Sequence, residues 1–175
     1  TLKIREAYKQ FIVKLLMLSG YKKADAERMR DNVMGIEMEL AKVAMTRTEQ
    51  RDYMVQYNIR TLAEVEKLCP NIDWKQYLTA QYLPIVDSMC VMQLKSLEKV
   101  NELIANKSMR EIKDYLIFHL VNSASDYLGD NFRKVNFEMS STISGAEQDR
   151  PRWKRALSVP DGMLGEALGQ IYVKK

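Results

Sequence analysis

The sequence predicts an all-α fold of about eight helices, mostly antiparallel and joined by short loops. Three observations indicate this class. The 175 residues include only seven Gly and four Pro, which favours long elements over many turns. Apolar residues recur at three- and four-residue steps in several segments, as they do on one face of a helix. Two sequences of the Ser/Thr-x-x-Glu type, beginning at Thr61 and Ser108, are typical of capped helix starts.

The first two helices are predicted to form an antiparallel pair. Residues 2–19 carry an apolar stripe that comprises Ile4, Tyr8, Phe11, Leu15 and Leu18. Gly20 follows, where a helix C-terminus favours a left-handed residue. A second stripe comprises Met29, Val33, Ile36, Leu40 and Val43. Asp25 and Glu27 fall in the first turn of that helix, where carboxylates suit the helix dipole.

The middle of the chain predicts shorter elements. Residues 46–60 lose the helical period and are expected to form an extended connector. Thr61 and Glu64 cap a short helix from Leu62 to Cys69, which Pro70 ends. Asp73 caps another short turn at 74–78. The stretch 85–93 is compatible with a short strand or with a buried helical start, and residues 94–107 return to helix.

The C-terminal part predicts further helices and one break. Ser108 and Glu111 cap a long helix that Gly129 closes, and its predicted packing face holds Ile112, Leu116, His119, Ser123 and Tyr127. The next helix spans 131–143 and ends near Gly145. A helix over 151–158 is expected to break at the Pro-Asp-Gly sequence 160–162, before a last apolar face over 163–173. Gly165 and Gly169 lie four apart on that helix, so a neighbouring helix could approach closely.

The sequence offers no catalytic and no metal-binding motif. His119 is the only histidine, so a His-Glu-x-x-His pair cannot be present. Cys69, Cys90 and His119 lack the short ligand spacing of structural zinc sites, and two cysteines leave open whether they pair. His119 is instead expected to be a core imidazole that hydrogen-bonds to a neighbour. Because no nucleophile elbow and no glycine-rich phosphate loop occur, no catalytic residue is assigned and no cofactor is expected in this chain.

A basic segment surrounds Trp153 near the end of the chain. Arg150, Arg152, Lys154 and Arg155 could bind phosphates, with the indole as a stacking surface. On a helix these charges fall on several faces, and the net charge of the chain is only +4. Arg can also stack on Trp or pair with carboxylates across an interface. No nucleic-acid partner is therefore expected, and no membrane span is expected because no run of about eighteen apolar residues occurs.

Three stretches of the chain have distinctive sequences: RDYMVQYNIRTLAEVEKLCPNIDWKQYL (51–78), LIFHLVNSASDYLGDNF (116–132) and RPRWKRALSVPDGMLGEALGQIYVKK (150–175). They resemble the neprilysin-like zinc endopeptidases, and the third is similar to bacterial, endopeptidase O-like members of that family. The resemblance extends from about Ile36 to Lys175 and is weak over 80–107. It implies an enzyme that is helical around a catalytic chamber, with one domain that carries zinc and a second domain that caps the chamber.

The resemblance also implies a place for this chain in such an enzyme. Residues 1–75 resemble the N-terminal part of the catalytic domain, and residues 76–175 resemble the first part of the capping domain. The zinc motif of the family is missing, so we expect an inactive, non-catalytic fragment of a zinc-dependent metalloendopeptidase that forms helical walls of the substrate chamber. Zinc, peptide substrates and the remainder of the same polypeptide are implied for the parent. The compartment stays open, with the cell envelope or secretion slightly favoured over the cytoplasm.

Five residues are singled out for the chamber wall. Arg150, Arg152, Trp153, Gly165 and Gly169 are expected to be structural or interface residues. Because the chain begins with Thr1 and ends on two lysines, both ends are expected to be boundaries within a longer polypeptide. The alternative is a stand-alone helical module that binds a peptide, a protein or nucleic acid through the basic segment 150–155.

Overall fold

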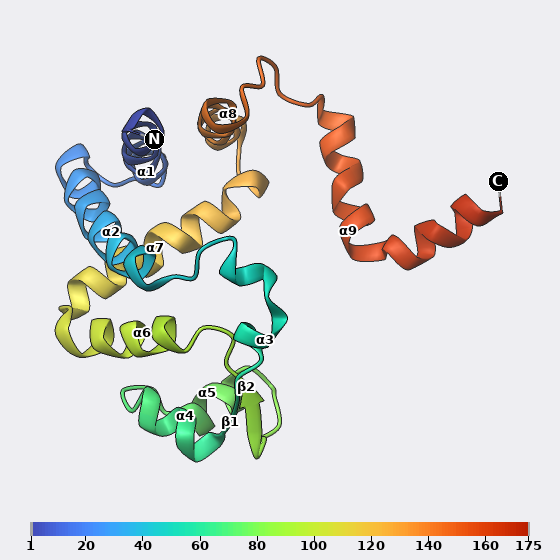
Figure 1. The fold of residues 1–175 in the computed structure, drawn as a ribbon. Coiled ribbons are helices and arrows are strands. Elements are labelled where there is room, and N and C mark those ends of the chain that lie inside the picture. The colour runs from blue at the N-terminus through green and yellow to red at the C-terminus, as the bar shows by residue number, and fades with distance from the viewer. Residues whose placement is uncertain (1, 175) are drawn as a thin grey trace.

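The structure is a computed structural model that describes residues 2–174, in which nine α-helices, two 3₁₀ helices and two strands occur (Figure 1). Thr1 and Lys175, on which the predicted chain boundaries fall, lie outside the described residues. The all-α class is confirmed, with one helix more than the eight or so predicted. The helices are α1 (Leu2–Leu18), α2 (Lys23–Val43), α3 (Tyr53–Gln56), α4 (Leu62–Leu68), α5 (Trp74–Ala80), α6 (Leu94–Asn106), α7 (Met109–Ala124), α8 (Asp130–Ser144) and α9 (Arg152–Val173).

The core lies where α1, α2, α7 and α8 meet. α1 packs against α2, α7 and α8, and α2 packs against α6 and α7. The buried cluster comprises Phe11, Ile12, Val13, Leu15, Leu16, Ala26, Met29, Val33 and Phe118. Each fully buried aliphatic or aromatic side chain stabilises the fold by about 1.5–3 kcal/mol. Four helices that bury one common cluster therefore form the stable centre of the chain.

The predicted pair of N-terminal helices is present. Gly20 has φ +94° and ends α1 in the left-handed region, as expected. Met29, Val33 and Ile36 of the second predicted stripe are buried. In the first stripe Phe11 and Leu15 are buried, whereas Ile4 and Leu18 are exposed. The buried face of α1 shifts towards Ile12 and Leu16, because α7 and α8 cover α1 from a second side.

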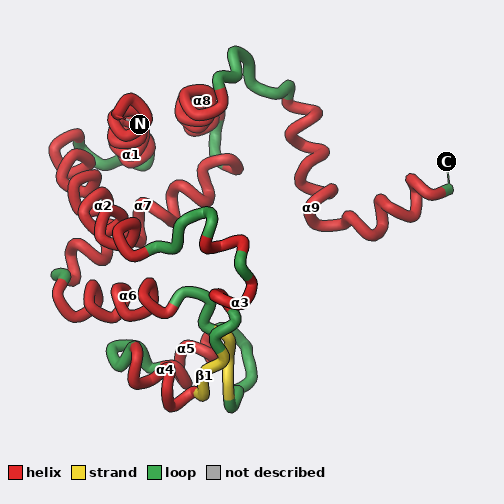
Figure 2. Tube along the Cα trace, viewed as in Figure 1, coloured by secondary structure: helices red, strands yellow, loops and turns green. Residues whose placement is uncertain are grey.

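A small two-stranded sheet corrects the prediction for residues 46–60. This segment is not an extended connector: it contains a 3₁₀ helix (Glu49–Arg51), then α3, and then β1 (Ile59–Thr61). The Glu49 carboxylate accepts from the backbone N–H and the hydroxyl of Thr46. Asp52 caps α3 by accepting from the Met54 N–H. β1 pairs antiparallel with β2 (Ser88–Cys90), with Ile59 opposite Cys90. The strand within 85–93 is therefore confirmed; in Figure 2 the yellow strands lie together at one end of the molecule.

The predicted caps at the N-terminal ends of three helices are confirmed. Thr61 and Ser108 each form the reciprocal capping box with the glutamate three residues later. Asp73 accepts from the Gln76 N–H at the start of α5. These local signals fix the first residue of α4, α5 and α7.

Two predictions for α7 are wrong. The helix ends at Ala124, followed by a 3₁₀ turn, and Gly129 (φ −62°) is the residue before α8 rather than a left-handed end of α7. The buried residues of α7 are Asp114 and Phe118, whereas Leu116 and Tyr127 of the predicted packing face are exposed. α7 carries apolar residues on both faces, so its periodicity alone could not select the side that meets α1 and α2.

The break predicted at 160–162 is displaced. α9 continues through Pro160 and bends at Leu164, whose φ of −125° and ψ of 26° are not helical. Proline inside a helix removes one hydrogen bond and crowds the carbonyl four residues earlier, although its fixed φ is near the helical value. The bend instead forms between Gly162 and Gly165, where helix propensity is weakest. In Figure 1, α9 extends away from the other helices as a bent arm after the loop that follows α8.

Candidate functional site

The basic segment at the start of α9 is exposed and partly ordered by its own contacts. Trp153 is 60% exposed, and the Lys154 Nζ lies 5.3 Å from the centroid of its ring. The Arg155 Nε donates to the Arg150 carbonyl oxygen at 3.0 Å. Arg150 and Arg152 are exposed too. These contacts are exposed, and exposed charge contacts contribute little to stability.

Gly165 and Gly169 face open space. A Cβ added at either position would meet no atom within 4 Å, so no other part of residues 2–174 makes the close approach expected at these glycines. A shallow, open hollow of about 480 Å³ lies along α9 and is lined by Arg150, Lys154, Leu157, Ser158, Asp161 and Leu168. The basic segment and the second half of α9 thus border one concave surface.

The described residues do not converge on a metal. Among residues 2–174, no group of three or more His, Cys, Asp or Glu side chains lies close enough to hold a metal ion, so Cys69, Cys90 and His119 form no such group. Both cysteines are free; Cys69 is buried and Cys90 is exposed. Burial raises the pKa of the Cys69 thiol, which disfavours the reactive thiolate.

His119 lies at the junction of α1, α2 and α7, beside a tyrosine–glutamate pair. The Tyr8 hydroxyl donates to the Glu37 Oε1 at 2.7 Å, and the His119 Nε2 lies 3.4 Å from the same oxygen. Burial, reinforced by Glu37, raises the pKa of Tyr8 above its usual value. The side chain of His119 is 39% exposed and its Nε2 has no hydrogen-bond partner, so the expected hydrogen-bonded core imidazole is not found.

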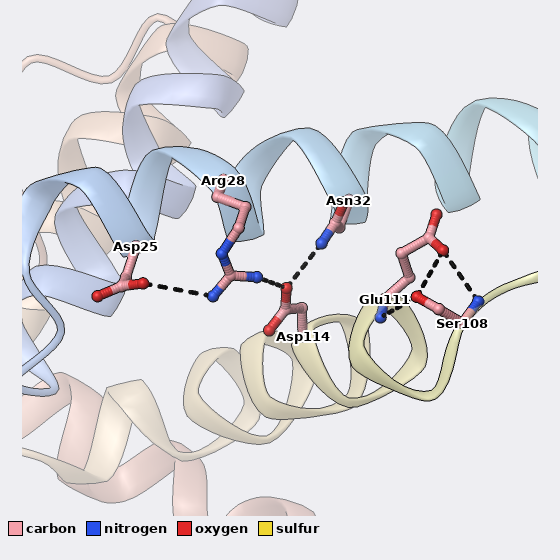
Figure 3. A network of polar contacts seen from close by, with 6 residues as sticks. All are labelled: Asp25, Arg28, Asn32, Ser108, Glu111 and Asp114. Carbon is pink, nitrogen blue, oxygen red and sulfur yellow. Dashed lines mark hydrogen bonds and ion pairs between the residues drawn. The ribbon is translucent and has the colours of Figure 1, made fainter.

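A partly buried polar network joins α2 to α7 (Figure 3). Asp114 on α7 is only 5% exposed, and its Oδ2 accepts from the Arg28 Nη1 and, at 2.7 Å, from the Asn32 Nδ2. Asp25 lies 3.5 Å from the other side of the Arg28 guanidinium. The sequence reasoning missed this network, although Asp114 precedes the buried Phe118 by one helical turn. The network fixes how the two helices face each other.

A second hollow lies between the end of α2, α3 and the start of α6. Its volume is about 530 Å³, and Lys42, Glu49 and Lys95 supply its charged lining. The Gln93 side-chain oxygen at its edge already accepts from the Met45 N–H and the Ser96 hydroxyl. The Gln93 oxygen is thus already occupied by groups of the chain itself.

No helix among residues 2–174 combines the length and the apolar character that crossing a membrane requires.

Comparison with known proteins shows which family this chain resembles in sequence and fold. The model for the N-terminal part of Peptidase family M13 matches residues 1–175. Neprilysin-1 of Caenorhabditis elegans is 28% identical over 152 residues, which cover 83% of this chain and 20% of that protein. Neutral endopeptidase of Lactobacillus helveticus is 29% identical over 163 residues, which cover 93% and 25%. A crystal structure of the Mycobacterium tuberculosis zinc metalloprotease Zmp1 in complex with an inhibitor superposes with a TM-score of 0.89 at 25% identity, over 98% of this chain and 27% of that chain.

The chain spans about a quarter of the length of these relatives. One of these relatives is an animal protein and the others are bacterial, so the bacterial origin that the resemblance suggests stays a prediction. Because the family match runs along the whole sequence and the fold agrees with that of a solved zinc metalloprotease, the chain belongs to peptidase family M13.

Proposed function

We propose that this chain is a non-catalytic part of a zinc-dependent metalloendopeptidase that cleaves peptides, in which it forms helical walls of the substrate chamber. One observation carries the proposal: 98% of the chain superposes on just over a quarter of an inhibitor-bound zinc metalloprotease. A stand-alone interaction module that acts through residues 150–155 is not favoured, because the relatives are peptidases of much greater length.

The residues of this chain do not fit zinc. A protein zinc site needs three or four nitrogen, sulfur or oxygen ligands that converge, and residues 2–174 contain no such group. The proposal therefore assigns the metal and the bond-breaking step to other polypeptide of the parent enzyme. No step of peptide hydrolysis is assigned to a residue of this chain.

The finer assignments are proposals too. Residues 1–75 are assigned to the catalytic domain and residues 76–175 to the capping domain, although α1 and α2 share their core with α7 and α8 from across that boundary. Arg150, Arg152, Trp153, Gly165 and Gly169 are assigned to the wall or to an interface within the enzyme. Arg150, Arg152, Trp153 and Gly165 are exposed and Gly169 is half-buried, so these residues are available for such contacts.

A peptidase assay on two lengths of polypeptide tests the proposal. Chain 1–175 and the longer polypeptide that contains it are each incubated with Zn²⁺ and a quenched fluorescent peptide. We expect cleavage by the longer polypeptide, loss of that cleavage with a chelator, and no cleavage by chain 1–175 above the buffer blank. Chelator-sensitive cleavage by chain 1–175 would show that the chemistry lies within it, and an inactive longer polypeptide would remove the peptidase function.

A further inference from the structure

We propose that His119 and Glu37 form a pH-sensitive contact, which tightens the packing of α7 against α2 when the imidazole gains a proton. The contact lies in the core, where α7 packs against α1 and α2 (Figure 1). The inference goes beyond the proposed function and does not depend on it, because it needs neither zinc nor a peptide substrate.

The Nε2 atom of His119 is turned into the protein. This atom is buried and has no hydrogen-bond partner, although the rest of the side chain reaches solvent. It lies 3.4 Å from the Glu37 Oε1. In a neutral imidazole only one ring nitrogen carries a hydrogen, so Nε2 faces the carboxylate either as a lone pair or as an uncharged donor. A buried polar atom in this state costs stability.

Three titratable side chains face this contact, one from each packed helix. Tyr8 of α1 donates its hydroxyl to the Glu37 Oε1 of α2, and the Tyr115 ring of α7 lies 4.3 Å from the imidazole, centroid to centroid. Burial, reinforced by the charge of Glu37, raises the pKa of both Tyr8 and Tyr115, so the two phenols stay neutral near pH 7. Of the three groups, Glu37 alone supplies charge to the imidazole.

Protonation changes what Nε2 can do. Both ring nitrogens of an imidazolium carry a hydrogen, so Nε2 becomes a charged donor that faces Glu37. Charge-assisted hydrogen bonds are shorter and stronger than neutral ones. Because Glu37 belongs to α2 and His119 belongs to α7, the new bond ties the two helices together.

The contact predicts the direction of the pH dependence. A protonated His119 gains a partner in the folded chain and gains none in the unfolded chain, so stability rises as the pH falls through the range near 6.5 where histidines titrate. The gain is lost as the pH rises above that range. His119 is the only histidine, so no other imidazole contributes. Solvent reaches part of the ring and screens the charge, which keeps the effect modest.

Thermal unfolding of chain 1–175 tests the contact at about pH 5.5 and about pH 8, on either side of the histidine range. His119→Gln removes the titrating group, and Glu37→Gln removes the charge but keeps an oxygen that can accept from Tyr8. We expect the Tm advantage of the unsubstituted chain over each variant to be about 2–4 °C larger at the lower pH. Glu98→Gln, the same chemical change at an exposed position of α6, is the control and should show no such dependence.

Two outcomes would overturn the proposal. A Tm advantage that is equal at both pH values would show that the two side chains only fill space. A pH dependence that disappears in His119→Gln but persists in Glu37→Gln would give the imidazolium a partner other than Glu37.

Hydrogen exchange on the unsubstituted chain repeats the test if a variant fails to fold. After correction for the intrinsic exchange rate, the amides of α2 and α7 should be more protected at the lower pH, and unchanged protection contradicts the proposal. Neither measurement involves peptide cleavage, so failure of the contact leaves the proposed function untouched.

Discussion

At the scale of single residues, Asp114 carries the most consequential polar contact of the core. A carboxylate this deeply buried is costly to desolvate unless charged and neutral donors satisfy it. Arg28 supplies the charge and Asn32 supplies a second donor on the same oxygen. Both donors come from α2, so Asp114 holds α7 in one orientation against α2.

Substitution of this carboxylate should be costly. Asp114→Asn leaves the Arg28 guanidinium without its buried counter-charge, and we expect the free energy of unfolding to fall by about 2 kcal/mol. Glu98→Gln, the same chemical change at an exposed position of α6, should alter it by less than about 0.5 kcal/mol. Urea titration of chain 1–175 measures both. Equal effects of the two substitutions would show that the network is energetically neutral.

At the scale of elements, the helix caps show how local chemistry sets boundaries. The Glu111 carboxylate accepts from the hydroxyl and the backbone N–H of Ser108, and these bonds lower the pKa of Glu111. A lowered carboxyl pKa means that the cap stabilises α7 above the unfolded pKa of about 4. This contribution disappears as the pH falls through the lower folded pKa.

Removal of the cap should destabilise the chain in a pH-dependent way. Ser108→Ala is expected to lower the free energy of unfolding by about 1 kcal/mol at pH 7, because the first turn of α7 loses a bonded N–H. Ser123→Ala, at an exposed position on the same helix, is the control and should have a smaller effect. Thermal unfolding at pH 7 and at pH 3 measures both variants. The gap to the unsubstituted chain should narrow at pH 3, and a constant gap would contradict a role for ionised Glu111.

The caps also mark how far the sequence could predict the fold. Thr61, Asp73, Ser108 and Gly20 act on residues within about one turn, so their patterns are visible in the sequence. The pairing of β1 with β2 and the choice of the buried face of α7 depend on residues about thirty or more positions away. For the candidate site, the sequence indicated the basic segment and the glycines but not Asp114. Asp114 could not be found because its partners lie on another helix.

Substitution of a glycine in α9 should change stability in opposite directions in chain 1–175 and in the longer polypeptide. Gly169→Ala should stabilise α9 in chain 1–175 by about 0.5–1 kcal/mol, because alanine favours helix and its Cβ meets no atom within 4 Å. In the longer polypeptide a neighbouring helix is proposed to approach α9 closely at its glycines, and the same Cβ would meet that helix, so we expect lower stability there. Circular dichroism and thermal unfolding measure the two cases. Gln170→Ala on the polar side is the control, and a stabilising Gly169→Ala in both lengths would place position 169 outside the contact.

At the scale of the whole molecule, the chain divides into a self-contained part and a dependent part. α1, α2, α7 and α8 bury a common core and are tied by Asp114 and by the Lys14–Glu138 ion pair. α9 follows the loop after Gly145 and has no extensive packing contacts with the other helices. We therefore expect the four-helix core to set the cooperative unfolding of chain 1–175, while α9 opens separately at low cost.

The uncovered α9 has a consequence for biosynthesis. In a relative about four times as long, any polypeptide that follows the counterpart of α9 is translated only after that helix has emerged from the ribosome. Each hundred residues that follow take on the order of ten seconds at ordinary translation speeds. During this interval, the exposed apolar side chains of α9 would be attached to a helical core that has already folded. Chaperones bind nascent chains that expose apolar surface in this way.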